Sequence, residues 1–218
     1  MEHLPEGNLP GWLIPQQGAL VAFAGILASE GVLKGLIGPR EVPRLWSRHL
    51  MNCLVVAEPD RGLVPMGATV ADVGSGAGLP GVAWAIARPD ISVTLIEPLL
   101  RRSNFLEEVV AALLLSPRVQ VRRGRGEEVS TDGSWVGVDV VTARAVAPLD
   151  KLLGWTIPLL RTGGALVALK GNSAAGELDT AQQVAAVLGV RDLRIELCGV
   201  GEIEIPTTVV LGTKGATQ

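Results

Sequence analysis

The 218-residue sequence has few residues that could build a metal site, a disulfide framework or a stacking surface for bases. It contains two cysteines, two histidines and no tyrosine, and aromatic residues make up only 3% of the chain. Cys53 and Cys198 lie far apart without the spacing of metal ligands, and two thiols are too few for a disulfide framework. We therefore expect no metal and a reducing, cytoplasmic environment. Five Trp and two Phe also leave few platforms on which an RNA base could stack.

Charged residues are scarce as well, at 19% of the chain, and they sum to a net charge of −3 with a pI of about 5.5. No basic field surrounds the whole protein, so binding to a nucleic acid would depend on a local cluster of basic side chains. Glu2 and Glu6 give the N-terminus an acidic start, which differs from the basic start of a signal peptide. Residues 19–37 form the most apolar stretch, but Glu30, Lys34 and several glycines interrupt it. We therefore expect a soluble protein without a membrane span.

Apolar residues, at 48% of the chain, are abundant enough to fill the core of one globular domain. Before residue 67 they recur with the period of a helix, over residues 17–36 and again over residues 43–58. A stretch that contains Pro and Gly then ends this pattern. We predict an N-terminal helical element, residues 1–66, that packs on a main domain comprising residues 67–218.

After residue 67 short β-branched runs alternate with helical stretches, which is typical of an α/β fold with a largely parallel sheet. The last two runs follow each other without a helix between them, so the sheet is predicted to end in an antiparallel hairpin. The seven predicted strands comprise residues 69–73, 92–96, 119–122, 138–142, 165–169, 192–197 and 207–211. The predicted helices between them comprise residues 80–88, 101–115, 149–160 and 174–188.

The first predicted strand runs into a glycine-rich loop, residues 72–78 (DVGSGAG). Its glycines would let the turn adopt positive φ and approach a ligand at the carboxyl edge of the sheet. A dinucleotide site is an alternative, because residues 76–81 also satisfy G-x-G-x-x-G. The carboxylate of Asp72 would be unhelpful beside a pyrophosphate, whereas it suits the sulfonium and ammonium of S-adenosylmethionine. From this loop we assign to the cofactor site Asp72, Gly74, Gly76 and Gly78.

Two later segments reach the same edge of the sheet. Glu97 ends the second strand, where a carboxylate can accept hydrogen bonds from the ribose hydroxyls of either cofactor. Residues 124–128 (GRGEE) follow the third strand, at the edge where an adenine would lie, and Glu127 is available to the polar atoms of the base. An ordinary charged turn is an equally good interpretation of this segment.

Several short motifs follow one another between residues 43 and 171. They are LWSRHL at 45–50, DVGSGAGLPG at 72–81, Arg102 with Phe105 and Leu106, GRGEE at 124–128, TARAVA at 142–147 and LKG at 169–171. In this order they resemble one family, the bacterial 16S ribosomal RNA (guanine-N7) methyltransferase G family, also called glucose-inhibited division protein B. The resemblance implies a Rossmann-like class I fold, with a seven-stranded sheet and N-terminal helices, and S-adenosyl-L-methionine as the cofactor. It implies cofactor contacts at Gly74, Leu79, Gly126, Glu127 and Arg144.

The sequence departs from the family pattern in three places. Asn52 and Cys53 replace an acidic residue followed by serine. Arg101 stands where Lys is usual, and Glu97 with Pro98 replaces a strand end of the Asp-Ser type. The last two changes preserve the charge of the position.

No catalytic base is expected for such a reaction, because guanine N7 offers an exposed lone pair and carries no proton. Catalysis would come mainly from holding N7 in line with the methyl carbon. N7 lies in the deep, narrow groove of A-form RNA, so the target guanine should lie in a loop or be extruded. The basic side chains that could grip such an RNA are Arg44, Arg48, His49, Arg101, Arg102, Arg123, Arg125 and Lys170. For any one of the arginines a solvated surface ion pair is the alternative role.

The leading hypothesis is therefore N7 methylation of a guanine in 16S ribosomal RNA, with naked RNA or the small ribosomal subunit as partner and the protein as a monomer. A methyltransferase of the same fold could instead act on another RNA, a protein or a small molecule. An NAD-dependent dehydrogenase is less consistent with Asp72 and with the lack of a hydride-transfer acid/base pair. A non-catalytic RNA-binding protein that has kept the fold is a third alternative.

Overall fold

A computed structural model describes residues 9–171 and 173–216, and it contains the seven-stranded sheet that the sequence predicts. The strand order is β3-β2-β1-β4-β5-β7-β6, with β7 inserted between β5 and β6. Strands β1 to β5 pair in parallel, and β7 is antiparallel to both of its neighbours. The strands are β1 Thr69–Val73, β2 Ser92–Ile96, β3 Val119–Arg122, β4 Val138–Arg144, β5 Leu160–Lys170, β6 Val190–Cys198 and β7 Thr207–Lys214. The predicted fold class is confirmed, and the acidic start on which we based the absence of a signal peptide lies outside the described residues.

Five helices follow the strands of the main domain: α3 Gly81–Ala87, α4 Leu100–Ala112, α5 Gly126–Thr131, α6 Leu149–Thr156 and α7 Ala174–Val187. Four of them were predicted from hydrophobic periodicity. The sequence did not predict α5, because six residues are too few to show a period. Its first turn is fixed instead by a local cap, in which the Arg125 N–H donates to the Glu128 carboxylate at 2.9 Å.

Two helical stretches precede the sheet, as predicted, but both begin earlier than the periodicity indicated. The first, Gly11–Gly31, contains α1 (Gln17–Ile26), and the second contains α2 (Met51–Leu54). Short segments of other helix types complete these stretches and the turns beside the sheet. The 3-10 helices are Gly11–Gln16, Pro39–Arg44, Val55–Ala57, Pro59–Arg61 and Ile157–Leu159, and the π-helices are Leu27–Gly31 and Leu45–Leu50.

Among the described residues, only the stretch Gly11–Gly31 is long and apolar enough to cross a membrane by length and composition. That is weak evidence for a span, because helices that contribute to a soluble core pass the same test. Leu13, Leu20, Phe23 and Leu27 are buried in the main core, so one side of the helix is committed to packing.

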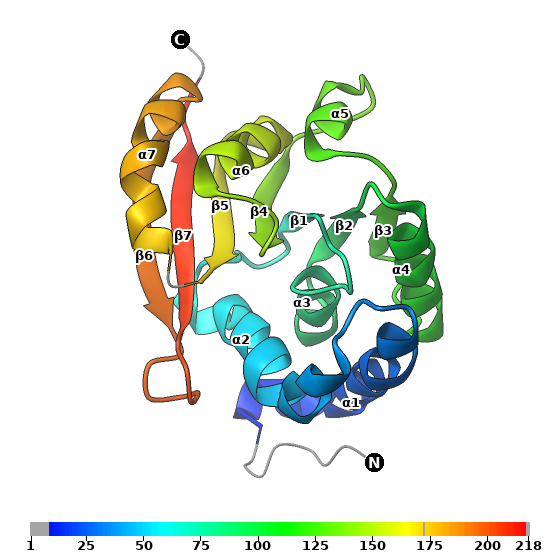
Figure 1. The fold of residues 1–218 in the computed structure, drawn as a ribbon. Coiled ribbons are helices and arrows are strands. Elements are labelled where there is room, and N and C mark those ends of the chain that lie inside the picture. The colour runs from blue at the N-terminus through cyan, green and yellow to red at the C-terminus, as the bar shows by residue number, and fades with distance from the viewer. Residues whose placement is uncertain (1–8, 172, 217–218) are drawn as a thin grey trace.

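The helices cover both faces of the sheet, which explains why its parallel strands are apolar on both sides (Figure 1). On one face α1, α2, α3 and α4 share a single hydrophobic cluster with the strands, and on the other face α5, α6 and α7 form a second cluster. Successive residues of a strand point to opposite faces, so Val70 of β1 packs in the first cluster and Ala71 in the second. The N-terminal helices are therefore part of the core of the main domain. We propose that the helical element, which the structure describes from residue 9 to residue 66, forms one folding unit with the sheet.

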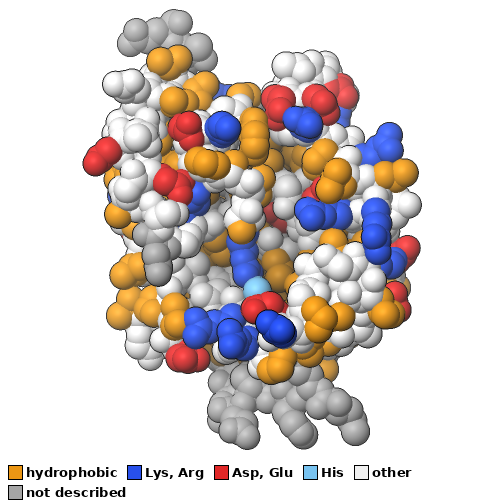
Figure 2. Space-filling view, in the orientation of Figure 1, with side chains coloured by type: hydrophobic (Ala, Val, Ile, Leu, Met, Phe, Trp, Pro, Cys, Tyr) orange, Lys and Arg blue, Asp and Glu red, His pale blue; other side chains and the backbone are white. Residues whose placement is uncertain are grey.

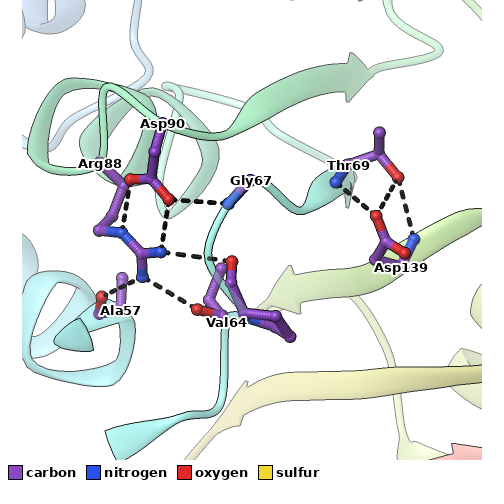
Figure 3. A network of polar contacts seen from close by, with 8 residues as sticks. Ala57, Val64, Gly67, Thr69, Arg88, Asp90 and Asp139 are labelled. Atoms are coloured by element: carbon purple, nitrogen blue, oxygen red, sulfur yellow. Dashed lines mark hydrogen bonds and ion pairs between the residues drawn. The ribbon is translucent and has the colours of Figure 1, made fainter. Parts of the chain in front are cut away.

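A polar network fixes the segment that joins the N-terminal helices to β1 (Figure 3). Arg88, which is buried at the end of α3, pairs with Asp90 through two hydrogen bonds of 2.8 and 2.7 Å. Asp90 also accepts a hydrogen bond from the Gly67 N–H at 3.0 Å. The same guanidinium donates to three carbonyl oxygens of the joining segment, those of Ala57, Val64 and Pro65. Beside it, the Asp139 carboxylate accepts from the N–H and the hydroxyl of Thr69, both at 2.7 Å, which ties the start of β1 to β4.

Candidate active site

A cavity of about 560 Å³ opens at the carboxyl ends of the central strands. Its wall combines the loop after β1, the ends of β2 and β4, and the start of α5. Leu36 and Ile37 close it from the N-terminal element. Figure 2 shows the hollow near the middle of this face, with Lys and Arg side chains gathered along its rim. A site at this edge agrees with the usual position of ligands in open α/β sheets.

The loop after β1 has the backbone that its glycines predict. Gly74, Gly76 and Gly78 have φ angles of 70°, 53° and 90°, which side chains rarely tolerate. A Cβ atom on Gly74 would lie 2.8 Å from Val146, so this glycine also allows the loops after β1 and β4 to pack together. Gly74, Gly76 and Leu79 line the cavity, whereas Gly78 is buried behind it beside α3.

Asp72 lies beneath this loop and is fully buried. Its Oδ2 atom accepts a hydrogen bond from the Gly81 N–H at 3.0 Å, and its Oδ1 atom has no hydrogen-bond partner among the described residues. Burial raises the pKa of Asp72 to about 7, although the Gly81 N–H acts in the opposite direction. Asp72 is not part of the cavity wall, so the structure gives it a supporting position under the loop. Direct contact with a cofactor stays a prediction.

Glu97 holds the loop from the neighbouring strand. Its Oε2 atom accepts a hydrogen bond from the Gly76 N–H, and its Oε1 atom accepts one from the Leu99 N–H, both at 3.0 Å. The side chain lines the cavity, and only 1% of the residue is exposed. Because a carboxylate accepts more than two hydrogen bonds, Glu97 keeps lone pairs for ligand hydroxyls.

The segment after β3 also reaches the cavity, at the first turn of α5. Gly126 and Glu127 both line it. A Cβ atom on Gly126 would lie 2.5 Å from the Trp155 carbonyl oxygen, so glycine is needed for the close approach of α5 to α6. Trp155, which the sequence did not predict as a site residue, lines the same wall. It lies near the end of α6, and no local pattern distinguishes it from an ordinary packing residue.

Arg144 ends β4, and the N-terminal element holds its guanidinium. Its Nη2 atom lies 2.6 Å from Nδ1 of His49, and its Nη1 atom donates to the His49 carbonyl oxygen at 3.2 Å and to Sγ of Cys53 at 3.1 Å. The other ring nitrogen of His49 lies 3.0 Å from a carboxylate oxygen of Glu41. Arg144 and His49 both line the cavity. Glu41 was not anticipated, because its contact with His49 shows only once the chain is folded.

Seven of the eight basic residues assigned to RNA fall into three groups. Arg102 and Arg125 are exposed and line the cavity, with Arg101 and Arg123 exposed beside them. In the N-terminal element, Arg44 is exposed and Arg48 is half-buried, with its Nη2 atom 3.9 Å from Glu204. His49 is turned inward, against Arg144.

Lys170 has a different environment from the one we expected. Its Nζ atom donates to the Ala147 carbonyl oxygen at 2.9 Å and lies 2.7 Å from the Glu177 carboxylate. Only 9% of the side chain is exposed. The structure therefore gives Lys170 the role of supporting the loop after β4, which differs from the contact with RNA that we predicted for it.

Among the described residues, neither cysteine belongs to a group of side chains that could hold a metal ion. Cys53 and Cys198 are both buried as free thiols. Burial raises the pKa of the Cys53 thiol, and the nearby Arg144 guanidinium lowers it less. In the described part of the chain no group of three or more His, Cys, Asp and Glu side chains could hold a metal ion.

The comparisons with known proteins agree with one another. A family model described as "rRNA small subunit methyltransferase G" (GidB) matches residues 16–205. The ribosomal RNA small subunit methyltransferase G of Salinispora arenicola is 56% identical over 193 residues, which cover 87% of this chain and 78% of the relative. That of Mycolicibacterium gilvum is 50% identical over 198 residues, covering 91% and 85%. This chain belongs to the rRNA small subunit methyltransferase G family.

Solved structures with low sequence identity share the fold. An S-adenosylmethionine-dependent O-methyltransferase from Thermotoga maritima aligns with a TM-score of 0.52 at 18% identity, covering 77% of this chain and 66% of that one. The S-adenosylmethionine-dependent methyltransferase SibL aligns with a TM-score of 0.57 at 20% identity, covering 81% and 58%. The expected Rossmann-like fold, the family and S-adenosylmethionine as its cofactor are thereby confirmed. Because the chain belongs to the methyltransferase G family, the alternative of an NAD-dependent dehydrogenase is excluded.

Proposed function

We propose that this protein transfers the methyl group of S-adenosylmethionine to N7 of a guanine in 16S ribosomal RNA of the small subunit. The observation that carries the proposal is the cavity at the carboxyl edge, which a glycine loop, Glu97 and Arg144 line together. Its volume of about 560 Å³ fits the range of small-molecule sites. Membership of the methyltransferase G family supports ribosomal RNA as the acceptor.

The residues of the cavity match the chemistry of this cofactor. Close-packed backbone at Gly74 and Gly76 would cover its amino-acid part, and Glu97 would accept hydrogen bonds from its ribose. Gly126 and Glu127 would meet the adenine, as the family resemblance implies. The bound cofactor supplies a methyl group on a positively charged sulfur. Asp72, whose pKa burial raises to about 7, would in its ionised form favour that positive charge from beneath the loop.

The acceptor needs positioning more than proton transfer. Guanine N7 has a free lone pair, so no side chain has to remove a proton before methyl transfer. The protein must hold N7 in line with the methyl group and exclude water from the cavity. Because methylation makes the base cationic, the carboxylates of Glu97 and Glu127 in the cavity wall would stabilise the product.

Two groups of arginines would grip the RNA on either side of the cavity mouth. Arg44 and Arg48 belong to the N-terminal element, and Arg102 and Arg125 to the wall formed by α4 and α5. A guanine extruded between them could enter the cavity while the arginines contact flanking phosphates. Substitution of Arg48 by Ala would weaken RNA binding and leave cofactor affinity unchanged. We further propose that the protein acts as a monomer in the cytoplasm, where its ribosomal substrate is assembled.

The proposal is tested with small ribosomal subunits from cells that lack the enzyme. The protein is incubated with them and with S-adenosylmethionine carrying a radiolabelled methyl group, and the RNA is digested to nucleosides. We expect the label in 7-methylguanosine. Label in another nucleoside would refute the proposed position, and no label despite measurable cofactor binding would indicate another acceptor. A variant with Gly74→Val, which places a branched side chain against Val146, serves as the cofactor-binding control.

A further inference from the structure

Arg144 is the only cavity residue whose charged group is held by the N-terminal element through a histidine, within the described part of the chain. His49 contacts the guanidinium twice, with its ring nitrogen Nδ1 at 2.6 Å and with its backbone carbonyl at 3.2 Å. The far side of the imidazole contacts Glu41 at 3.0 Å. These contacts form a continuous chain of three side chains from the surface to the cavity.

The two partners of the imidazole, Arg144 and Glu41, require one tautomer of His49. A guanidinium has only hydrogen-bond donors, so Nδ1 must present its lone pair to Arg144. A carboxylate has only acceptors when ionised, so Nε2 must carry the proton and donate it to Glu41. The neutral Nε2–H imidazole therefore satisfies both partners. A second proton, on Nδ1, would place an N–H group against the guanidinium.

The charges around His49 favour the same state. Burial lowers the pKa of His49, and Arg144 lowers it further, while the hydrogen bond to Glu41 raises it. The hydrogen bond to His49 lowers the pKa of Glu41, so this carboxyl is ionised at neutral pH, and Arg44 and Arg48 act in the same direction. Cys53, which also contacts Arg144, is held as a neutral thiol by its burial.

Along this series of contacts, the side chain at the outer end is more exposed than the side chain in the cavity wall. The side chain of His49 is 18% exposed in the cavity wall, and that of Glu41 is 41% exposed. Glu41 belongs to the same helical segment as Arg44, one of the arginines at the RNA-facing rim. The chain of contacts thus connects the RNA-facing part of the N-terminal element with the cavity.

We propose that Glu41 and His49 are positioning residues that hold Arg144 in the cavity wall, and that methyl transfer requires His49 in its neutral Nε2–H form. This inference rests on the proposed function and on the cofactor contact that the family resemblance implies for Arg144. Protonation of His49 at acidic pH breaks its bond to Arg144 and lets the guanidinium leave the wall. The activity therefore falls below the pKa of His49, although the methyl transfer itself moves no proton.

The first test measures kcat for methyl transfer to small subunits across the acidic range. His49→Ala should lower kcat about tenfold at pH 7.5, as the loss of one charge-assisted hydrogen bond would. His49→Asn keeps an acceptor near the position of Nδ1 and cannot titrate. Compared with His49→Ala it should restore part of kcat, and it should flatten the acidic limb of the pH profile of kcat. Glu41→Gln removes the charge that raises the pKa of His49 and should move the acidic limb to lower pH. Glu204→Gln, which removes a charge near Arg48, is the matched control and should leave the limb in place.

The second test does not depend on activity. The chain has two histidines, so a His3→Gln background leaves His49 as the only imidazole in a nitrogen-15 NMR titration. We expect the Nε2–H tautomer with a pKa below the ordinary value, and a further decrease in Glu41→Gln. The Nδ1–H tautomer, or a pKa that Glu41→Gln does not change, would overturn the inference.

Arg144→Lys separates the failure of the inference from the failure of the proposed function. If Arg144→Lys lowers kcat while the His49 and Glu41 variants behave as the unchanged protein, only the positioning role of Glu41 and His49 is refuted. If Arg144→Lys has no effect, the proposed role of Arg144 and this inference fail together. If no subunit is methylated at all, the NMR titration still decides the state of His49.

Discussion

At the scale of single residues, the site depends on places where a side chain would not fit. Gly74, Gly81 and Gly126 each lie against a neighbour that a Cβ atom would approach to 2.8 Å or less. All three belong to motifs of the sequence, DVGSGAGLPG for Gly74 and Gly81 and GRGEE for Gly126. The motifs could not show that Gly81 touches Asp72 or that Gly126 touches Trp155, because both contacts join separate elements of the fold.

Gly81→Ala tests this packing. The new Cβ atom would lie 2.6 Å from Oδ2 of Asp72 and 2.5 Å from the Leu95 side chain, so α3 must move away from the sheet. We expect a loss of unfolding free energy of about 1–3 kcal/mol, measured in urea, and weaker binding of S-adenosylmethionine by calorimetry. Gly154→Ala is the matched control, because its Cβ position in α6 has no neighbour within 4 Å apart from adjacent residues and the backbone of its own helix. It should stabilise the protein by up to about 1 kcal/mol, and equal effects of the two changes would argue against the packing explanation.

At the scale of elements, apolar periodicity predicted most of the sheet and its helices. The first three strands have the predicted bounds, because β-branched runs between polar turns leave little choice. Strand β5 begins five residues earlier than predicted, since Gly163 and Gly164 hid its first half from a pattern of apolar residues. Helix α5 was missed for lack of length, and the inward position of Lys170 depends on Glu177 from another element. Local patterns carry no information on such pairings.

Asp90→Asn tests the network that fixes the segment before β1. The paired Arg88 guanidinium lowers the pKa of Asp90 from 3.8 to about 2. A carboxyl whose pKa is lower in the folded protein stabilises it above its unfolded pKa, and this contribution is lost as the pH falls from about 4 to about 2. We expect Asp90→Asn to cost on the order of 1 kcal/mol at pH 7, a value reduced for solvent screening because the side chain is 32% exposed.

The difference between the wild type and Asp90→Asn should shrink toward zero below pH 3, as measured by urea unfolding at a series of pH values. Asp179→Asn removes an exposed carboxylate on α7 and should show no such trend. A pH-independent difference for Asp90→Asn would mean that the ion pair with Arg88 is not the source of the stability.

At the scale of the whole molecule, the N-terminal helices and the sheet share one hydrophobic cluster. Phe23 of α1 and Trp84 of α3 are fully buried in it, and the Trp84 indole donates to the Cys53 carbonyl oxygen at 2.8 Å. From the change in hydrophobic periodicity after residue 66 we predicted a boundary between these two parts. That change marks a change of secondary structure, and the packing that joins the two sides could not be predicted from it.

We therefore expect a single cooperative unfolding transition. Scanning calorimetry should give a calorimetric enthalpy equal to the van't Hoff enthalpy, with no separate melting of the helical element. Removal of residues 9–57 would expose the apolar face of α3 and should yield an insoluble product. Two resolved transitions, or a soluble and folded truncated protein, would show that the helical element is an independent domain.

The insertion of β7 between β5 and β6 also determines when the sheet can be completed during synthesis. Translation delivers β5 and then β6 before the strand that must pair with both of them has been made. Until residues 207–214 leave the ribosome, β5 has an unpaired edge and β6 has no partner, and such edges are prone to aggregate. A chain interrupted just before Thr207 would lose the pairing of two other strands as well as its own last strand. The last few residues of the sheet therefore limit how early in its own translation this enzyme can become active.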